Sequence, residues 1–482
     1  MRNHSMKKNI IYNFFKTFSS IVFPLLIFPY ISRVLAPDNI GRIQFGQSIV
    51  NYFALIASLG IATYAIRLCS TVRNDREKLG LMASEIFSIN VFTTALAYVL
   101  MTISLLLFRE LHDYRILIAI QSITIIMTTM GTDWVNSAME DFKYITIRTF
   151  IIQILSLIAI FCFVRKPDDY FIYAVVMALS ASGTNILNIW YRRRYCKVTF
   201  TTHIKWSKHL KPILLLFVML LAQSIFSNAD TTMIGIMRGD YEVGLYSVPV
   251  KITNIISQVF ASVLIVVLPQ LSIGFEENNF EKINILLHKI LSLTITIGLP
   301  CITGAYVLAE ELILVAAGAE YSPAVPALKI LMISAFFSLI GGSFFGNMIL
   351  LPSKKEKEFM IACCITAIAN VLFNAIFIPV YGLNAAAGTT VASYFILMLL
   401  LIRKVDRRIK INGLTRIFIS PILGCLAIIL FCKLCIYCFS ILWLRIGISI
   451  TGSIFLYCLI LFFMKNETMQ ELLNLLFHSK EK

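Results

Sequence analysis

The sequence predicts an all-α integral membrane protein with about 14 transmembrane helices. Of its 482 residues, 58% are hydrophobic and only 14% are charged, against about 25% charged residues in an ordinary soluble domain. Long apolar runs alternate with short basic segments, which is the pattern of spanning helices and their loops. A chain this apolar could not cover its surface with polar groups, so soluble, disordered and fibrous classes are excluded.

The first apolar run, from about Ile10 to Leu35, is expected to remain as a transmembrane helix. It holds roughly 25 residues, which is longer than the apolar core of a cleaved signal peptide, and no Ala-x-Ala pattern follows it. Pro24 and Pro29 should kink it, which membrane helices tolerate when neighbouring helices satisfy the freed backbone groups.

Further apolar runs of about 20 residues, the length that a spanning helix needs, continue to the end of the chain. The predicted spans are 10–35, 43–66, 80–108, 115–137, 146–164, 170–191, 212–237, 243–271, 285–308, 323–351, 358–380, 383–403, 415–440 and 444–464. The loops between them are mostly short, which predicts a helical bundle with little outside it.

The Lys and Arg residues set the predicted orientation. With the N-terminus in the cytoplasm, 30 of the 42 Lys and Arg fall in cytoplasmic segments and 8 in outside segments, with the rest inside spans. This bias follows the positive-inside rule, so both termini and the 191–211 and 403–416 loops are predicted to be cytoplasmic. The formal net charge of +16 is therefore attributed to loops at a membrane, and no nucleic-acid partner is expected.

An internal repeat is predicted from two similar stretches. Residues 37–43 resemble residues 240–246 at an offset of 203, and each is a polar turn with a Gly (Gly41 and Gly244) opening the next helix. The predicted domains are a six-helix half at 1–195, a basic cytoplasmic linker at 196–211, a second six-helix half at 212–404, and two extra helices with a cytoplasmic tail at 405–482. Transporters often bind substrate between such halves, and a duplication without a pore remains the alternative.

Several ionisable residues fall inside predicted spans, where they are costly and usually face protein or a water-filled cavity. Asp230 is too short to reach the headgroups. Asp230 and Lys251 lie at similar depth on consecutive antiparallel helices, so they either form a pair or both face a cavity. The complete set is Lys16, Glu85, Asp133, Asp230, Lys251, Lys329 and Lys433, with Arg33, Arg67 and Arg148 near span ends.

Amide side chains accompany these charges in pairs spaced four residues apart, which places each pair on one helix face. The pairs are Gln47 with Asn51, Asn254 with Gln258, and Asn370 with Asn374. Single amides often only join helices, whereas paired faces in both halves favour a hydrated interior.

Motifs for an enzyme or a metal site are missing from the sequence. It has no Gly-rich nucleotide-binding loop, and no predicted outside loop is longer than roughly 15 residues. Cys432, Cys435 and Cys438 lie in an apolar span without His or carboxylate partners, which favours helix packing over metal binding. We predict no cofactor, no metal site and no catalytic residue.

Five stretches, taken in order, resemble polysaccharide-repeat flippases of the Wzx type. Asp133-Trp134 is followed by 140–148 at a helix junction, and Asp230 is followed by Ile234-Gly235, Val243-Gly244-Leu245-Tyr246 and Lys251-Ile252. The others are Pro29-Tyr30-Ile31-Ser32-Arg33-Val34-Leu35 with Gly41, Asp168-Asp169-Tyr170-Phe171-Ile172-Tyr173, and Gly318-Ala319-Glu320-Tyr321 with Ala327-Leu328-Lys329-Ile330-Leu331. The resemblance covers the first twelve spans.

The resemblance implies a MATE-like member of the multidrug/oligosaccharidyl-lipid/polysaccharide exporter superfamily in the bacterial inner membrane. Such proteins move undecaprenyl-diphosphate-linked oligosaccharides from the inner to the outer leaflet for O-antigen, lipopolysaccharide or capsule synthesis. A diphosphate needs cationic donors and sugar hydroxyls need amides, so the predicted cavity residues are Lys16, Arg33, Gln47, Asn51, Lys251, Asn254 and Lys329. Asp230, Glu85 and Asp133 are candidates for coupling to a proton or sodium gradient.

Two other functions remain open. A multidrug exporter of the same fold would prefer a cavity lined by carboxylates and aromatics, whereas the Lys residues in the predicted spans outnumber the carboxylates. A glycan polymerase or membrane glycosyltransferase would need a large outside loop. The expected partners are the lipid-linked oligosaccharide, membrane lipids, and the polymerase and chain-length regulator of the same pathway.

Overall fold

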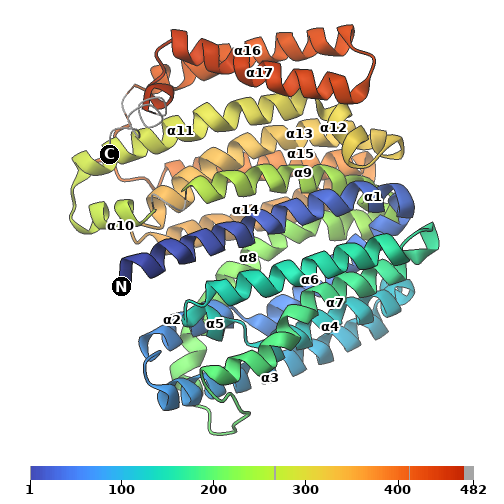
Figure 1. Cartoon of the computed structure of the whole chain (residues 1–482), viewed down its shortest axis with the longest axis vertical. Helices are drawn as coiled ribbons and strands as arrows, with labels where there is room; N and C mark the ends of the chain where they lie inside the picture. Colours follow the sequence, from blue (N-terminus) through green and yellow to red (C-terminus); the bar gives the residue numbers. More distant parts are fainter. Residues whose placement is uncertain (1, 265–267, 412, 472–482) are drawn as a thin grey trace. The chain divides into compact units, whose positions relative to one another are not determined.

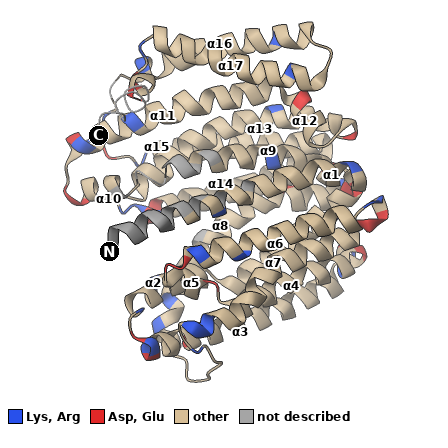
Figure 2. Cartoon of the chain, in the orientation of Figure 1, with Lys and Arg blue, Asp and Glu red and all other residues tan. Residues whose placement is uncertain are grey.

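The computed structural model describes residues 2–264, 268–411 and 413–471, and all regular secondary structure in this part of the chain is helical. The helices divide into two compact units, Met1–Gly244 and Leu245–Lys482. Charged side chains gather near the helix ends of each unit, while the middle turns are almost free of them (Figure 2). This distribution is the one that a bilayer selects.

The first unit holds eight α-helices and three short 3₁₀ helices. In chain order they are α1 (Arg2–Ser58), α2 (Ile61–Thr71), α3 (Arg76–Leu107), η1 (Arg109–Tyr114), α4 (Arg115–Gly131), α5 (Trp134–Ala138), α6 (Phe142–Phe163), η2 (Pro167–Asp169), α7 (Tyr170–Tyr191), η3 (Arg192–Arg194) and α8 (Trp206–Arg238). Helix α1 packs along α3, α4, α6 and α8 and organises the unit.

The second unit contains α10 to α17. Helix α9 (Asp240–Leu264) crosses from the first unit into the second. It is followed by α10 (Leu268–Glu276), α11 (Phe280–Val307), α12 (Ala309–Ala316), η4 (Ala319–Ala324), α13 (Val325–Ser338), the π-helix η5 (Leu339–Leu350), α14 (Glu356–Tyr381), α15 (Leu383–Ile402), α16 (Leu414–Cys438) and α17 (Leu442–Phe463). Helices α16 and α17 form an antiparallel pair that packs on α11 (Figure 1).

Twelve helices of the described residues are long and apolar enough to cross a membrane. One of them, Phe18–Thr71, covers two of the predicted spans. The backbone leaves the helical region at Ala36, and this kink separates the two spans. Pro37 follows directly, and a proline disfavours helical geometry at the residue before it. The twelve therefore correspond to thirteen of the predicted spans, and α9 occupies the place of the fourteenth, whose residues 265–267 lie outside the described part.

Two predicted spans are interrupted. The predicted helix 43–66 breaks at Leu59 and Gly60, both with positive φ, and α2 begins after the break. The predicted helix 115–137 ends at Gly131, because Thr132 is left-handed with φ 44°. Hydropathy reports the apolar composition of these stretches and carries no information on a single left-handed residue. The prediction of an uninterrupted helix was therefore wrong at both points.

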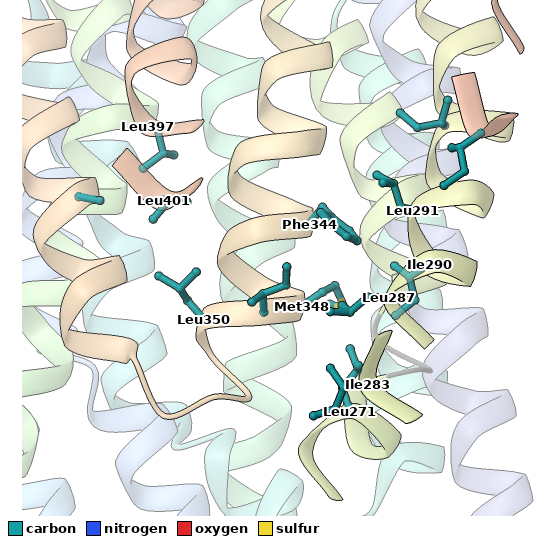
Figure 3. Close-up of a cluster of buried hydrophobic side chains, with 14 residues drawn as sticks. Leu271, Ile283, Leu287, Ile290, Leu291, Phe344, Met348, Leu350, Leu397 and Leu401 are labelled. Carbon is teal, nitrogen blue, oxygen red and sulfur yellow. The ribbon is translucent and has the colours of Figure 1, made fainter. Parts of the chain in front are cut away.

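Apolar clusters hold each unit together. In the second unit, Phe344, Met348 and Leu350 of η5 lie between side chains of α11 and α15 (Figure 3). The cluster also includes Leu287, Ile290, Leu291, Leu397 and Leu401. Because lipid tails are as apolar as Leu, close packing stabilises such a cluster more than transfer from the solvent does.

Helix α8 belongs to the first compact unit, whereas the predicted repeat starts its second half with this helix. Packing and sequence repetition are different properties, so the domain division at 195, 211 and 404 stays a prediction.

Candidate functional site

Two polar stripes face each other where α1 and α8 pack in the first unit. Gln47 Nε2 donates to Asn51 Oδ1 over 3.0 Å, so the two amides share one face, as their spacing predicts. Asn51 Nδ2 donates to Asn228 Oδ1 of α8 over 3.0 Å. Asn228 in turn donates to the Ser224 carbonyl over 2.9 Å. The three amides form a continuous hydrogen-bonded row between the two helices.

Hydroxyl groups extend this row by one turn. Thr232 Oγ1 lies 2.9 Å from Ser48 Oγ and 3.4 Å from the Tyr52 hydroxyl. Asp230 is 7% exposed and interacts electrostatically with Tyr52. We call the combined set the polar seam: Gln47, Ser48, Asn51, Tyr52, Asn228 and Thr232.

The polar seam lies at mid-depth of a spanning segment. The second part of α1 runs from Pro37 to Ser58, which places Gln47 and Asn51 roughly 15 and 21 Å along a length of about 33 Å. Gln47, Asn51 and Asn228 are half-buried. Amides that keep exposure at this depth would be costly against lipid.

The two stretches of the predicted repeat touch each other within the first unit. A methyl group built on Gly41 would lie 1.8 Å from the carbonyl oxygen of Asp240, and one built on Gly244 would lie 1.9 Å from that of Pro37. Pro37 and Asp240 are themselves equivalent positions of the repeat. The contact is therefore reciprocal, as across a two-fold axis, and only glycine allows the two backbones to approach so closely.

Side chains also join the two repeat stretches. Arg42 Nε lies 3.2 Å from Asp240 Oδ2, and the Tyr114 hydroxyl donates to Asp240 Oδ1 over 2.5 Å. Asp240 therefore joins the beginning of α9 to α1 and to η1. Arg42 is about half exposed, so the ion pair contributes little by itself, and the backbone contact dominates.

The sequence predicts that Asp133 lies inside a spanning helix, but in the structure it lies outside one. It stands in the break between α4 and α5, where its carboxylate pairs with Arg148 of α6. The Asp133 side chain is 37% exposed and that of Arg148 is 4% exposed. The placement in a span was wrong because the left-handed Thr132 ends α4 first.

Helix α7 holds this break in position. Asn188 donates to the Gly131 carbonyl over 2.6 Å and accepts a hydrogen bond from Asn136. Arg192 donates to the Met130 carbonyl over 2.8 Å and to Thr132 Oγ1 over 2.5 Å. These bonds satisfy the backbone carbonyls that the end of α4 leaves free.

Asp141 caps the N-terminus of α6 beside the same break. Its carboxylate accepts hydrogen bonds from Tyr191 (2.7 Å) and Tyr195, and from the Tyr144 amide. Burial by itself would raise the pKa of Asp141, but the hydrogen bonds from Tyr195, Tyr191 and the Tyr144 amide hold this pKa below its ordinary value.

The predicted cationic residues lie on three helices, α1, α9 and α13. Lys16 is half-buried on α1, and Arg33 Nη1 donates to the Pro29 carbonyl of the same helix over 2.5 Å. In the second unit, Lys251 is half-buried and Asn254 exposed on α9. Lys329 of α13 lies 6.0 Å from the centre of the Tyr306 ring.

The predicted pairing of Asp230 with Lys251 stays a prediction, since Asp230 belongs to the first unit and Lys251 to the second. Asn370 and Asn374 are fully buried on α14, and Asn374 accepts a hydrogen bond from Thr389 of α15. This amide pair therefore joins two helices.

The structure reveals two polar contacts that the sequence did not. His209, predicted to lie in the cytoplasmic linker, belongs to α8 and is fully buried against Glu85 and Tyr64. Glu311 of α12 is 3% exposed and pairs with Arg445 of α17 over 3.1 Å. The Trp206, Leu210 and Ile213 spacing around His209 was a helical signal that the neighbouring lysines obscured.

Within the residues that the structure describes, no group of three or more His, Cys, Asp or Glu side chains could hold a metal ion. Cys432 and Cys435 are buried, and Cys432 Sγ lies 3.3 Å from Ser453 Oγ of α17.

Sequence comparisons identify the family. The sequence model described as "Polysaccharide biosynthesis protein" matches residues 6–275, more than half of the chain. A protein of Escherichia coli (strain K12) named "Putative O-antigen transporter" is 22% identical over 363 residues, covering 74% of this chain and 86% of its own. The "Capsular polysaccharide biosynthesis protein CapF" of Staphylococcus aureus is 25% identical over 405 residues, covering 82% and 98%.

Solved structures confirm the fold. "Lipid II flippase MurJ, inward closed conformation" superimposes with a TM-score of 0.76 at 18% identity, over 95% of this chain and 99% of that one. An inward-facing multidrug resistance MATE family transporter of the MOP superfamily gives 0.60 at 14% identity, over 84% and 94%. The predicted all-α, MATE-like membrane fold is therefore confirmed.

The family match, the relatives and the fold agree with the Wzx-type resemblance found in the sequence. The chain is a multi-pass membrane protein and a transporter rather than an enzyme. Because the family model covers more than half of its length, it belongs to the polysaccharide biosynthesis protein family.

Proposed function

We propose that this transporter moves undecaprenyl-diphosphate-linked oligosaccharides from the inner to the outer leaflet of the bacterial inner membrane. The oligosaccharide would be a repeat unit of a surface polysaccharide such as O-antigen or capsule. The names of its relatives, an O-antigen transporter and a capsular polysaccharide biosynthesis protein, support this substrate class.

The observation that carries the proposal is the polar seam between α1 and α8. Its half-buried amides and hydroxyls lie at mid-depth and offer both donors and acceptors. Sugar hydroxyls require such mixed partners. A lipid-linked oligosaccharide crossing the bilayer would exchange its water for these groups, which lowers the cost of carrying sugars through the apolar layer.

The diphosphate needs cations as well. Lys16, Lys251 and Lys329 are the lysines assigned to this role, since an ammonium group donates charge-assisted hydrogen bonds to phosphate oxygens. Transport would proceed by alternating access through a cationic cavity. A proton or sodium gradient is the proposed driving force, and the polymerase and chain-length regulator of the pathway are the proposed partners.

A multidrug exporter is the second candidate, because a MATE transporter shares the fold. Such an exporter binds organic cations, so its site needs carboxylates more than lysines. The seam residues of this chain are uncharged amides and hydroxyls with one carboxylate, Asp230, beside them.

A flipping assay with the purified protein in liposomes tests the proposal. Undecaprenyl-diphosphate-oligosaccharide is placed in both leaflets, and an added lectin reports the fraction that becomes accessible. We expect this fraction to rise with the protein and an organic cation dye not to be transported. Dye transport without oligosaccharide flipping would establish the multidrug exporter instead.

The lysines are tested in the same assay. Lys251→Ala and Lys329→Ala should reduce flipping by about tenfold or more, equivalent to about 1.4 kcal/mol of binding. Lys251→Arg and Lys329→Arg keep the charge with a different donor geometry, and should retain part of the rate. Wild-type rates in both Ala variants would show that these lysines only extend toward the headgroups.

A further inference from the structure

A chain of three ionisable side chains joins three helices of the first unit. His209 Nε2 of α8 lies 2.8 Å from Glu85 Oε2 of α3. His209 Nδ1 lies 2.8 Å from the Tyr64 hydroxyl of α2. The rings of Tyr64 and His209 also meet edge to face, with centres 5.7 Å apart. We call Glu85, His209 and Tyr64 the histidine triad.

The histidine triad sits in an apolar pocket. His209 is 0% exposed, and the Glu85 side chain keeps 20% exposure. The surrounding cluster is formed by buried apolar side chains such as Ile61, Ile86 and Ile213, and its other ionisable members are the thiols of Cys69 and Cys196 and the hydroxyl of Tyr195. The nearest cations along α2 and α8, Arg67, Lys205, Lys208 and Lys211, are exposed. Water can therefore reach the triad through Glu85, while the imidazole stays shielded.

A neutral and a charged imidazole can both make the two hydrogen bonds of His209. In both states Nε2 carries a proton and donates it to the ionised Glu85. When His209 is neutral, Nδ1 accepts a hydrogen bond from the Tyr64 hydroxyl. When His209 is charged, Nδ1 donates and the Tyr64 oxygen accepts, because a hydroxyl can do either. One proton can thus be gained or lost with every hydrogen bond retained.

The proton changes how firmly α8 is held to α3. A neutral His209 and Glu85 share one hydrogen bond, whereas a charged His209 and Glu85 form an ion pair in an apolar pocket, which is stronger. Helix α8 also carries Asn228 and Thr232 of the polar seam. The charge of His209 therefore acts on the helix that presents two of the six seam residues.

We propose that the histidine triad is a proton-binding site through which a proton gradient drives transport. Its occupancy sets the strength of the contact between α8 and the α2–α3 pair. This inference rests on the proposed function for its role in the transport cycle, but proton binding itself does not depend on the substrate.

The first experiment measures the proton directly in the full-length protein. ¹⁵N-histidine labelling reports whether an imidazole is neutral or charged, and His209→Gln identifies the signal of His209 among those of the six His residues. The proposal requires the His209 signal to change from that of a neutral imidazole to that of a charged imidazole as the pH is lowered. A signal that does not change with pH would overturn the proposal, whether or not the protein flips oligosaccharides.

The second experiment imposes a pH gradient in the liposome flipping assay. The wild type should flip several-fold faster with the gradient than without it, and Glu85→Gln and His209→Gln should show equal rates in both conditions. Tyr64→Phe, which removes one hydroxyl, should reduce the stimulation, and His203→Gln, on the exposed segment before α8, should retain it. Full stimulation in the triad variants would overturn the proposal, whereas a wild type that does not flip oligosaccharides would reject the proposed function alone.

Discussion

Gly41 and Gly244, 203 positions apart, pack reciprocally against the carbonyls of Asp240 and Pro37. Each glycine contacts the residue that precedes the other glycine by four positions, so the two stretches are related as by a two-fold axis. A weak sequence repeat and a close backbone contact thus coincide, which is what an ancestral duplication that preserved its own interface would leave.

The Gly41 contact predicts a clear stability effect. Gly41→Ala or Gly244→Ala places a methyl group within 2 Å of a backbone oxygen, so the helices must separate, at a cost of roughly 1–3 kcal/mol or more. Thermal unfolding of the purified protein measures it. Gly304→Ala is the control, because Gly304 lies in α11 with nothing within 4 Å of a built methyl group. Equal midpoints for Gly41→Ala and Gly304→Ala would contradict the close contact.

The Asp133–Arg148 pair predicts an unequal response to removing its two members. Arg148 is 4% exposed and Asp133 is 37% exposed. Asp133→Asn leaves a buried cation uncompensated, and its cost should approach the roughly 3–5 kcal/mol of a broken buried pair. Arg148→Met leaves a carboxylate that water can reach, and should cost less.

Unfolding by denaturant measures both variants. Lys289→Met serves as control, because its partner Glu471 and Lys289 itself are both more than half exposed, and an exposed pair contributes about 1 kcal/mol or less. A larger loss for Arg148→Met than for Asp133→Asn would show that burial does not decide the order.

The pKa of Asp141 predicts how its contribution depends on pH. This pKa is lowered in the folded protein, so the stabilisation is complete above the unfolded value of about 3.9 and is lost as the pH falls through the folded value. Asn caps a helix about as well as Asp, so Asp141→Asn removes only the charge from the hydrogen bonds of Tyr191 and Tyr195, which should cost about 1 kcal/mol at pH 7. The difference between the unfolding midpoints of the two proteins should stay constant above about pH 4 and shrink as the pH falls below this value, and a difference that persists at the lowest pH would rule out this electrostatic origin.

The predicted orientation can be checked by cysteine labelling. In a background without the native cysteines, Thr202→Cys should be protected from a membrane-impermeant reagent added outside intact cells. Asp113→Cys, in η1, should react. The choice of Thr202 follows from the structure, because α8 already begins at Trp206. Ready external labelling of Thr202→Cys would reverse the orientation.

The sequence predicted the helices far better than the contacts between them. Hydropathy is a local property, so α14 and α15 were predicted to within three residues at each end. The breaks at Gly60 and Thr132 depend on single backbone angles that composition does not reveal. Glu85 was singled out from its depth, but its partner His209 lies 124 positions away and looked like part of a basic loop. The buried pair of Glu311 and Arg445 could not be predicted for the same reason, because the local sequence does not indicate a partner 134 positions away.

The polar seam is the central element of the proposed function, and the initial flipping rate of Asn228→Leu tests it most directly. Leu keeps the side-chain size and removes the amide that joins Asn51 to α8. Thr102→Leu is the matched control, because Thr102 is an exposed polar residue of α3 outside the seam. We predict a rate at least about tenfold lower for Asn228→Leu, equivalent to the loss of one or two hydrogen bonds to sugar, with Thr102→Leu within about twofold of the wild type. A wild-type rate in Asn228→Leu would contradict the account.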